Sequence, residues 1–317
     1  MTREAGEGLR KPLVVRVVRG STVDGPGLRS VVFFKGCSLR CRFCHNPEAQ
    51  EFGPELTVHP DRCVGCAACV AACPTGAVVA PASLDRSLCT VCGACAEACP
   101  SGALSMVGQA FSLEELEELL ARDRAWYELS GGGVTFSGGE PGLFPEFAGE
   151  LARRIRRRGW SVWLQTSGHF PWEPFAEHLL PYLDGIAFDV KAGSDELYRE
   201  LTGADSGPAR RNLARLAAWP GTLEVRMPLV PGWTDTDENL EAVARLLSGL
   251  GIRHLTLLAY NPLGASMAEA LGRTWDAPDR GYRPREIETI YARFRALLAR
   301  LDPEAARGTA SQEQGRR

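Results

Sequence analysis

Short apolar runs alternate with longer amphipathic stretches along most of the chain. The short runs are rich in apolar and β-branched residues and predict strands near Ser30–Phe34, Gly133–Ser137, Ser161–Gln165, Gly185–Asp189, Leu223–Pro228 and His254–Ala259. In the longer stretches apolar residues recur every three or four positions, which predicts helices near Leu113–Leu129, Pro145–Arg158, Trp172–Leu180, Pro208–Ala218, Thr236–Leu250 and Arg285–Leu301. Repeated strand–helix units indicate an α/β fold with a parallel sheet. Six strands, where a closed (β/α)8 barrel has eight, indicate an open, partial (β/α)6 barrel.

Composition and charge exclude several classes of protein. The 317 residues are 44% apolar and 24% charged, which argues against a disordered or low-complexity chain. The 36 basic and 39 acidic residues are interspersed and give a net charge of −3, unlike the basic surface of a nucleic-acid binder. The basic run Arg153–Arg158 has Leu151 and Ile155 on one face, which favours the solvated side of an amphipathic helix. We therefore expect no nucleic acid among the partners.

We expect no membrane among the partners either. The first residues carry charges but no apolar stretch of a signal peptide, and no later apolar run approaches the roughly 18 residues needed to cross a bilayer. Residues 1–12 and 303–317 are polar and aperiodic, so they are expected to be loose tails. These features predict a cytoplasmic protein.

All 11 cysteines lie between Cys37 and Cys99. An odd number of cysteines in a chain without a secretion signal argues against a disulfide framework. It favours metal or redox chemistry in a reducing compartment. The cysteines divide into two runs of four and one set of three.

The two runs of four are copies of one motif. C-x2-C-x2-C-x3-C-P occurs at Cys63, Cys66, Cys69 and Cys73 and again, 26 residues later, at Cys89, Cys92, Cys95 and Cys99. This is the signature of bacterial two-cluster ferredoxins, in which each [4Fe-4S] cluster takes three thiolates of one run and the last thiolate of the other. One cluster is then expected on Cys63, Cys66, Cys69 and Cys99, and the second on Cys89, Cys92, Cys95 and Cys73. Zinc is the alternative, although tetrahedral zinc sites usually draw their ligands in separated pairs.

The remaining cysteines form C-x3-C-x2-C at Cys37, Cys41 and Cys44. A [4Fe-4S] cluster has four irons, so three thiolates leave one iron with an open coordination position, and open positions mark reactive metal sites. We therefore expect a third, catalytic cluster that binds a substrate. A zinc site with three cysteines, completed by His45 or His59, is the alternative.

The sequence around these three cysteines resembles the radical S-adenosylmethionine superfamily and, within it, the activating enzymes of glycyl-radical enzymes. The resemblance rests on motifs that occur in the family's order and spacing from Thr22 to Gly264: TVDGPGLR at 22–29, CSLRCRFCHNP at 37–47, GGGVTFSGGEP at 131–141, FDVK at 188–191, VRMPLVPGW at 225–233 and LAYNPLG at 258–264. Such an ordered series is far more specific than a single motif.

The resemblance implies an enzyme that reductively cleaves S-adenosylmethionine to methionine and a 5′-deoxyadenosyl radical, which takes a hydrogen atom from a backbone glycine of a partner enzyme. It implies three [4Fe-4S] clusters, two of which would pass electrons from a low-potential donor such as flavodoxin or ferredoxin. We expect a monomer in an anaerobic or facultative setting. A radical S-adenosylmethionine enzyme acting on a small molecule or peptide side chain, and a ferredoxin-like electron carrier, are the alternatives.

The duplicated cysteine motif interrupts the partial barrel. We expect the barrel of the radical S-adenosylmethionine fold at residues 13–53 and 108–302. The ferredoxin-like insert is expected at residues 54–107, with one repeat at 54–83 and the other at 84–107.

The resemblance also implies residues that contact S-adenosylmethionine. Gly138 and Gly139 leave the backbone bare for its amine, Lys191 suits its carboxylate, and Asp189 suits its ribose or sulfonium. Lys191 is notable because the chain has 33 arginines and only three lysines. Further contacts are expected from Phe43, Cys44, His45, Val190, Arg226 and Asn261.

Three more positions bear on the site. Asn261 stands where several family members carry a histidine near adenine, and Gln165 stands where some carry an acidic residue that holds a monovalent cation. Asp24 lies in a D-G-P-G turn, and the resemblance implies that this loop is near the incoming glycine loop.

Overall fold

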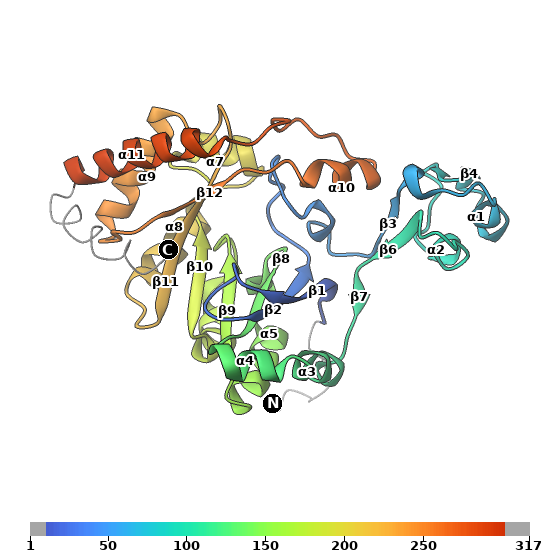
Figure 1. The fold of residues 1–317 in the computed structure, drawn as a ribbon, viewed down its shortest axis with the longest axis horizontal. Helices are drawn as coiled ribbons and strands as arrows, with labels where there is room; N and C mark the ends of the chain where they lie inside the picture. The colour runs from blue at the N-terminus through green and yellow to red at the C-terminus, as the bar shows by residue number, and fades with distance from the viewer. Residues whose placement is uncertain (1–10, 302–317) are drawn as a thin grey trace, which may run out of the picture.

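The computed structural model describes residues 11–301, with one large sheet and a smaller unit that projects from it (Figure 1). The large sheet has the strand order β12-β11-β10-β9-β8-β2-β1-β7. Its parallel strands are β2 (Arg29–Lys35), β8 (Gly133–Gly138), β9 (Ser161–Thr166), β10 (Gly185–Asp189), β11 (Thr222–Leu229) and β12 (Thr256–Ala259). The predicted α/β fold with a six-stranded parallel sheet is therefore confirmed.

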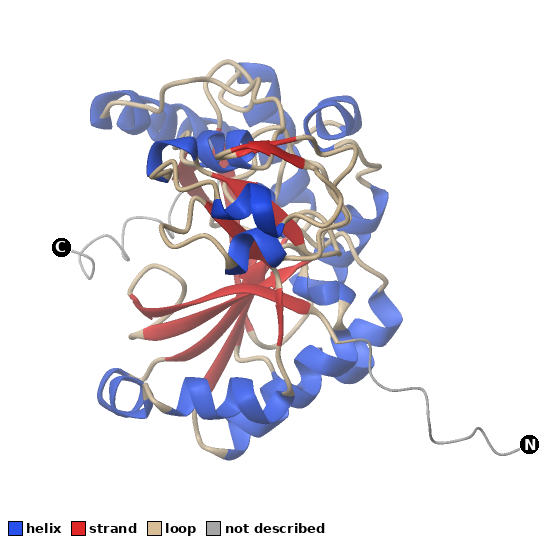
Figure 2. Cartoon of the chain, turned by 90° about the vertical axis from the view of Figure 1, so that its right-hand side faces the viewer, coloured by secondary structure: helices blue, strands red, loops and turns tan. Residues whose placement is uncertain are grey.

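Helices connect the parallel strands and pack around the sheet (Figure 2). The main ones lie within two residues of their predicted bounds and are α5 (Pro145–Arg157), α6 (Trp172–His178), α8 (Gly207–Ala217), α9 (Asp237–Gly249) and α11 (Pro284–Leu301). Their apolar faces and the strands form one continuous core, in which β8 is buried almost throughout. Burial on both faces is typical of parallel sheets.

Two antiparallel strands that the pattern does not predict extend one edge of the sheet. β1 (Leu13–Ser21) pairs with β2, and β7 (Gln109–Ala110) pairs with β1. No helix separates β1 from β2, so β1 lies outside the strand–helix alternation on which the prediction rests. The helices α7 (Asp195–Thr202) and α10 (Gly264–Ala270) are also not predicted, because they are shorter than the window over which helical periodicity is clear.

The single helix predicted over Leu113–Leu129 is in fact two, α3 (Leu113–Ala121) and α4 (Arg124–Ser130). Asp123 lies between them and is buried, where it accepts hydrogen bonds from Ser30 Oγ at 2.5 Å and Arg19 Nε at 2.8 Å. A buried carboxylate must be paired, and the break in the helix places Asp123 against these two donors.

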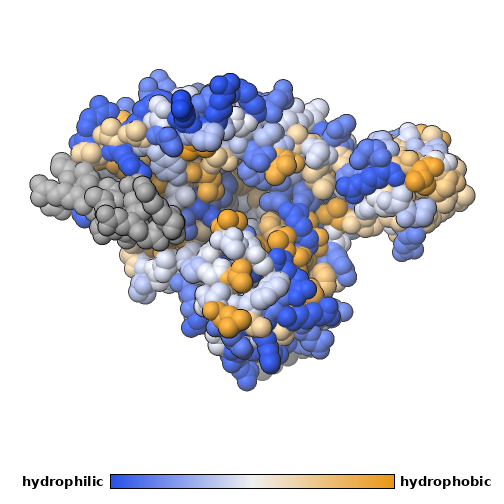
Figure 3. All heavy atoms as spheres, viewed as in Figure 1, coloured by the Kyte–Doolittle hydropathy of each residue, from blue (hydrophilic) through white to orange (hydrophobic). Residues whose placement is uncertain are grey.

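Between β2 and α3 the chain leaves the large sheet and forms the projecting unit, residues 54–107, which we call the insert. Its neck is the antiparallel pair β3 (Glu55–Val58) and β6 (Leu104–Val107). Beyond the neck lie two short helices and a small hairpin: α1 (Ala68–Ala72), α2 (Ala94–Glu97), β4 (Val78–Ala80) and β5 (Ser83–Leu84). The insert has its own small core of apolar residues and cysteines. Apolar residues also gather on its surface (Figure 3), including Val64 and Val79.

The basic run on α5 is paired with acidic residues. Arg154 Nη1 lies 2.7 Å from Glu114 Oε1, Arg154 Nε lies 2.9 Å from Glu150 Oε1, and Arg158 Nη2 lies 2.6 Å from Glu117 Oε1. These pairs agree with the solvated helix face that the sequence predicts.

Two further expectations concern membranes and the chain ends. None of the helices within residues 11–301 has the length and apolar character needed to cross a bilayer. The loose tails predicted at residues 1–12 and 303–317 lie outside the described residues, apart from residues 11 and 12.

Candidate active site

A cavity of about 350 Å³ opens at the carboxyl ends of the parallel strands. This edge of an open α/β sheet is where ligands usually bind. Four separate segments of the chain bring predicted site residues to it: Cys37, Cys41, Phe43, Cys44, His45, Gly138, Gly139, Asp189, Lys191 and Arg226. The fold therefore gathers most of the residues that the motifs single out.

Two predicted residues do not line the cavity. Val190 packs in the core, because alternation along an extended segment sends its side chain away from those of Asp189 and Lys191. Asn261 is exposed, and its Oδ1 accepts a hydrogen bond from the N–H of Leu263 at 3.2 Å. A contact of either residue with a cofactor stays a prediction.

Cys37, Cys41 and Cys44 lie on the loop that follows β2. The N–H of Gly36 donates to Ala49 O at 2.8 Å, and the N–H of Arg40 donates to Thr202 O, in the last turn of α7, at 2.8 Å. These bonds fix the loop on two sides, and the three half-buried thiols line the same cavity.

The arrangement of the cysteines bears on the zinc alternative. Within residues 11–301, no three His, Cys, Asp or Glu side chains converge on a point that could hold a single metal ion. A zinc ion needs four ligands at about 2.0–2.3 Å. The three thiols line one cavity, and a cluster held by three thiolates stays the prediction for them.

Burial controls the acidity of the three thiols. It raises the pKa of Cys37 and of Cys41, and it raises the pKa of Cys44 to about 12, because a thiolate in the cavity wall loses hydration. Without a bound metal, burial therefore favours the neutral thiol over the thiolate at these three positions. Metal binding would have to displace their protons, so the affinity of the loop for a metal rises with pH.

Asp189, Lys191 and Arg226 form a charged group on one wall of the cavity. Lys191 Nζ lies 3.0 Å from Asp189 Oδ2, and Arg226 Nε lies 3.4 Å from Asp189 Oδ1. Burial alone would raise the pKa of Asp189, but the charges of Lys191 and Arg226 outweigh it and hold this pKa below its usual value. Two cations and one anion leave a net positive charge, which suits a carboxylate ligand.

The same group has unfilled hydrogen-bonding capacity. The 3.4 Å separation is too long and poorly aligned for a full hydrogen bond, so Asp189 Oδ1 and Arg226 Nε are both buried without a hydrogen-bond partner. Buried polar atoms without a partner are costly. Their position on a cavity wall indicates that a bound ligand supplies the missing hydrogen-bond partners.

Gly138 and Gly139 end β8 and pack against the cysteine loop. A Cβ on Gly138 would lie 2.4 Å from Phe34 O, and a Cβ on Gly139 would lie 2.2 Å from Gly36 O. No side chain fits at either position. The glycines therefore have a packing role against β2 in addition to the close ligand approach predicted from the sequence.

Glu140 follows this turn. The sequence motifs alone assign it no role. It is fully buried and accepts hydrogen bonds from Thr166 Oγ1 at 2.7 Å and from Ser167 through both Oγ at 2.7 Å and the backbone N–H at 2.9 Å. It therefore ties the end of β8 to the end of β9. Its place in the GGGVTFSGGEP motif is the signal that could have identified it.

Gln165 lies in a polar chain that reaches the mouth of the cavity. Ser137 Oγ donates to Gln165 Oε1 at 2.7 Å, and Gln165 Nε2 donates to Asp24 Oδ1 at 2.6 Å. Gln165 and Asp24 both line the cavity. The amide of Gln165 thus supplies a hydrogen bond to the Asp24 carboxylate. Position 165 is the one at which some family members are expected to carry an acidic residue.

Phe43 and His45 flank the third cysteine. Phe43 is buried beside Leu201 and Tyr260 and also lines the cavity. The ring of the exposed His45 lies 5.9 Å from the ring of Tyr260. Both rings are placed where they could contact a flat ligand.

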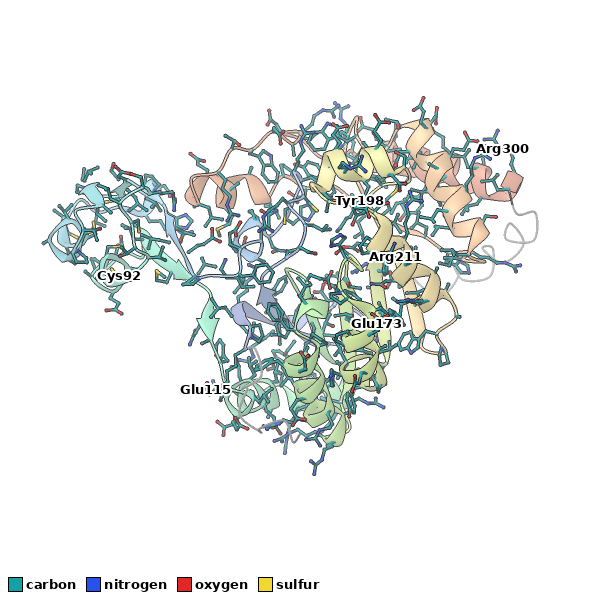
Figure 4. All side chains as sticks on the ribbon, turned by 180° about the vertical axis from the view of Figure 1, so that it is seen from behind. Cys92, Glu115, Glu173, Tyr198, Arg211 and Arg300 are labelled. Atoms are coloured by element: carbon teal, nitrogen blue, oxygen red, sulfur yellow. The ribbon has the colours of Figure 1, made fainter. Side chains whose placement is uncertain are left out.

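In the insert, one set of cysteines lines a second, far smaller cavity of about 10 Å³. Its walls include Cys73, Cys89, Cys92 and Cys95, which is the set predicted for one of the two ferredoxin-type clusters. Figure 4 shows Cys92 on the insert, well away from Tyr198 on α7 beside the barrel. The other predicted set, Cys63, Cys66, Cys69 and Cys99, is divided among buried, half-buried and exposed positions.

The two halves of the insert repeat their backbone conformation. Left-handed φ angles occur at Gly65 and Val91, with values of 73° and 55°, and at Ala67 and Gly93, with values of 57° and 85°. Each pair is 26 residues apart. A β-branched residue such as Val91 rarely adopts this conformation, and such strain concentrates at ligand and functional sites.

The final cysteine of each run is surrounded by backbone N–H donors in the same way, an arrangement that we call an amide cradle. The N–H groups of Val78 and Thr75 lower the pKa of Cys73 to about 7, and those of Leu104 and Ser101 lower the pKa of Cys99. Amide donors favour the thiolate, which is the form that binds metal.

Known proteins are similar to this chain over most of its length. Residues 23–203 match a family described as a 4Fe-4S single cluster domain. The chain is 36% identical to the benzylsuccinate synthase activating enzyme of Thauera aromatica, over 92% of this chain and 91% of that protein. It is 34% identical to the indoleacetate decarboxylase activating enzyme of Tractidigestivibacter scatoligenes, over 86% and 90%. It is 38% identical to the isethionate sulfite-lyase activating enzyme of Oleidesulfovibrio alaskensis, over 82% and 87%.

Proposed function

Because the chain belongs to the radical S-adenosylmethionine family of glycyl-radical enzyme activating enzymes, we propose that its active site is the cavity at the carboxyl ends of the parallel strands. The reaction reductively cleaves S-adenosylmethionine and places a radical on a backbone glycine of a partner enzyme. The observation that carries the assignment to this cavity is the convergence there of three thiols and the Asp189–Lys191–Arg226 group.

Cys37, Cys41 and Cys44 would hold the catalytic cluster. When bound, a [4Fe-4S] cluster with one free iron supplies the electron that breaks a carbon–sulfur bond of S-adenosylmethionine. The loop bonds from Gly36 and Arg40 fix the three thiolates in place, and Glu140 holds the adjoining Gly138–Gly139 turn from behind.

The charged group would orient S-adenosylmethionine. Lys191 and Arg226 provide the positive charge for its carboxylate, and Asp189 Oδ1 is the buried acceptor available for a hydroxyl or amine donor. The turn at Gly138–Gly139 lines the cavity and would offer its backbone to the amine, and the rings of Phe43 and His45, which also line the cavity, would contact adenine. Contacts of Val190 and Asn261 with the same ligand are part of this proposal as the sequence predicts them.

We further propose that the glycine loop of the partner enters beside Asp24. This residue lines the cavity and is held by Gln165 and Ser21, while the neighbouring Val23 lines the cavity and is mostly exposed. An entry at this point would bring a backbone glycine to the ligand without a side chain in the way. The protein would act as a monomer that docks onto its target.

The experiment that tests this function uses EPR spectroscopy. The anaerobic protein is mixed with S-adenosylmethionine, a reductant and a candidate glycyl-radical enzyme. We expect a glycine-centred doublet on the partner, and we expect the Cys41→Ala variant to give none. If S-adenosylmethionine is cleaved but no partner acquires a glycyl radical, the enzyme acts instead on a small molecule or a peptide side chain.

For the insert we propose a ferredoxin-like domain with two further [4Fe-4S] clusters, on the two cysteine sets given above. The repeated left-handed positions and the two amide cradles support this assignment, because both runs then wrap a cluster in the same way. The domain would span residues 54–107 and interrupt a barrel at 13–53 and 108–302. It would relay single electrons from a low-potential donor such as flavodoxin or ferredoxin.

The relay is tested by replacing Cys89 and Cys92 with alanine, which removes two ligands of one insert cluster. Cleavage of S-adenosylmethionine driven by reduced flavodoxin should fall, whereas cleavage driven by dithionite, a small reductant, should persist. If turnover with the protein donor is unchanged, the insert does not carry the electrons.

A further inference from the structure

Lys35 is one of the three lysines, and the function proposed above does not use it. It is the last residue of β2, directly before the cysteine loop, and its side chain is 0% exposed. Nζ donates to Glu55 Oε2 at 2.6 Å and to Glu48 O at 2.6 Å. Lysine is almost never fully buried unless it is paired, so this placement needs a reason.

Glu55 connects Lys35 to a second cation, Arg273. Glu55 is the first residue of β3, at the neck of the insert, and Arg273 follows α10. Arg273 Nη2 forms an ion pair with Glu55 Oε1, and Nη1 donates to Pro47 O at 2.5 Å. We call Lys35, Glu55 and Arg273 the neck clamp.

The neck clamp contacts both ends of the cysteine loop. Lys35 lies two residues before Cys37, and Pro47 lies three residues after Cys44. One carboxylate on the insert is therefore bonded to cations that are fixed on either side of the catalytic thiols. Ion pairs with buried, multiply bonded partners hold a defined geometry.

Other contacts also join the neck and the insert to the barrel near this clamp. A Cβ on Gly108, where the chain leaves the insert, would lie 2.7 Å from Lys35 Cδ, so the neck packs directly on the lysine side chain. Arg86, in the second repeat of the insert, donates to Leu56 O at 2.9 Å and to Ala270 O of α10 at 2.7 Å. The insert is thus joined to the barrel at three points besides the chain itself.

The clamp is also adjacent to a proposed cluster. Leu56, the residue after Glu55, lines the cavity formed by Cys73, Cys89, Cys92 and Cys95. A two-stranded neck alone is only marginally stable, and domains joined by a small interface move relative to each other. Without the clamp, only the neck and the hydrogen bonds of Arg86 would hold the distance between this cavity and the cysteine loop.

We propose that the neck clamp fixes the insert at one angle to the barrel and so keeps a constant distance between the cluster on Cys73, Cys89, Cys92 and Cys95 and the catalytic cluster. The inference rests on the proposed function, in which the insert relays electrons. Lys35, Glu55 and Arg273 are positioning residues, since none of them lines the catalytic cavity.

The test compares two variants with a matched control. The double variant Lys35→Met with Glu55→Gln removes the central ion pair, and the one cation that it leaves without its carboxylate, Arg273, is 26% exposed. The variant Arg273→Gln removes the outer cation. Because the side chain of Arg273 is 26% exposed, this change should destabilise the folded protein less than a change at the fully buried Lys35. Glu97→Gln makes the same chemical change at an exposed position of the insert.

Two readouts are taken on the reconstituted full chain. One is the EPR spin–spin interaction between the reduced insert cluster and the reduced catalytic cluster, which reports their separation directly. The second is the rate of S-adenosylmethionine cleavage with reduced flavodoxin divided by the rate with dithionite. We expect both clamp variants to weaken the interaction and to lower this ratio by about tenfold, as misplacement of reacting groups does. The Glu97→Gln control should match the wild type.

Unchanged spin–spin interaction and an unchanged ratio in both clamp variants would overturn the proposal. The outcome can be separated from a failure of the relay itself. If the Cys89→Ala, Cys92→Ala protein keeps full donor-driven turnover, the relay is wrong, while the spin–spin interaction in the clamp variants, whose clusters are intact, still decides whether the clamp sets the distance.

Discussion

At the scale of single residues, the site depends on a cluster of buried side chains with more positive than negative charges. Lys191 and Arg226 face one carboxylate, Asp189, and burial strengthens each interaction because little water screens it. Electrostatic attraction from Asp189 outweighs burial and raises the pKa of Lys191, so burial does not neutralise this lysine.

We predict that Lys191→Met weakens the binding of S-adenosylmethionine to the reconstituted protein. A hydrogen bond to a charged group contributes about 1.5–3 kcal/mol, so the dissociation constant should rise by about tenfold or more. Equilibrium binding measures this directly, with Lys11→Met, at an exposed lysine, as the control. An unchanged dissociation constant would remove Lys191 from the site.

A second residue-scale prediction concerns Gly139→Ala. The new Cβ would lie 2.2 Å from Gly36 O and 2.7 Å from Ala49 O, which are backbone atoms that flank the cysteine loop. The loop must move, and we expect the protein to lose the iron of the catalytic cluster while the insert keeps its own. Iron analysis measures this, and Gly53→Ala, where a Cβ meets open space, is the control. Full iron content in Gly139→Ala would show that the turn does not support the cluster.

At the scale of elements, the strand–helix alternation was sufficient to predict the parallel sheet but not its antiparallel edge. β1 has apolar residues but leads through a loop, not a helix, into β2, so only pairing with β2 reveals it. Asp123 interrupts the helix predicted over Leu113–Leu129 because its partners, Ser30 and Arg19, come from strands far away in sequence. Long-range contacts of this kind leave no local pattern.

The helix α5 offers a prediction about pH. Glu150 pairs with Arg153 and Arg154, and hydrogen bonds from these arginines lower its pKa to about 2. Since the pKa is lower in the folded state, the stabilisation is complete above the unfolded pKa of about 4.3 and is lost as the pH falls toward about 2. The free energy of unfolding should therefore differ between wild type and Glu150→Gln at neutral pH, by at most about 1 kcal/mol for a partly exposed pair.

Urea unfolding of both proteins between neutral and acidic pH measures this difference. It should shrink as the solution is acidified, because protonated glutamate and glutamine then resemble each other. A difference that grows toward low pH would contradict the assignment of these ion pairs to the stability of α5.

At the scale of the whole molecule, the sequence motifs identified the residues that line the cavity, but not the buried contacts that join the segments of the fold. The motifs predicted ten cavity-lining residues, because most of the motifs end or directly follow a strand and parallel strands end at one edge. They did not reveal Glu140, which acts through buried hydrogen bonds, or the neck clamp, whose members at 35, 55 and 273 belong to three separate segments. Such contacts exist only after the chain has folded.

The central claim is that the trio of thiols on the β2 loop holds a cluster with one iron free for S-adenosylmethionine. Mössbauer spectroscopy of the anaerobically reconstituted protein tests it most directly. We predict iron for three [4Fe-4S] clusters and a change in the signal of a single iron site when S-adenosylmethionine is added. Iron for only the two insert clusters, with no spectral change on adding S-adenosylmethionine, would contradict the account.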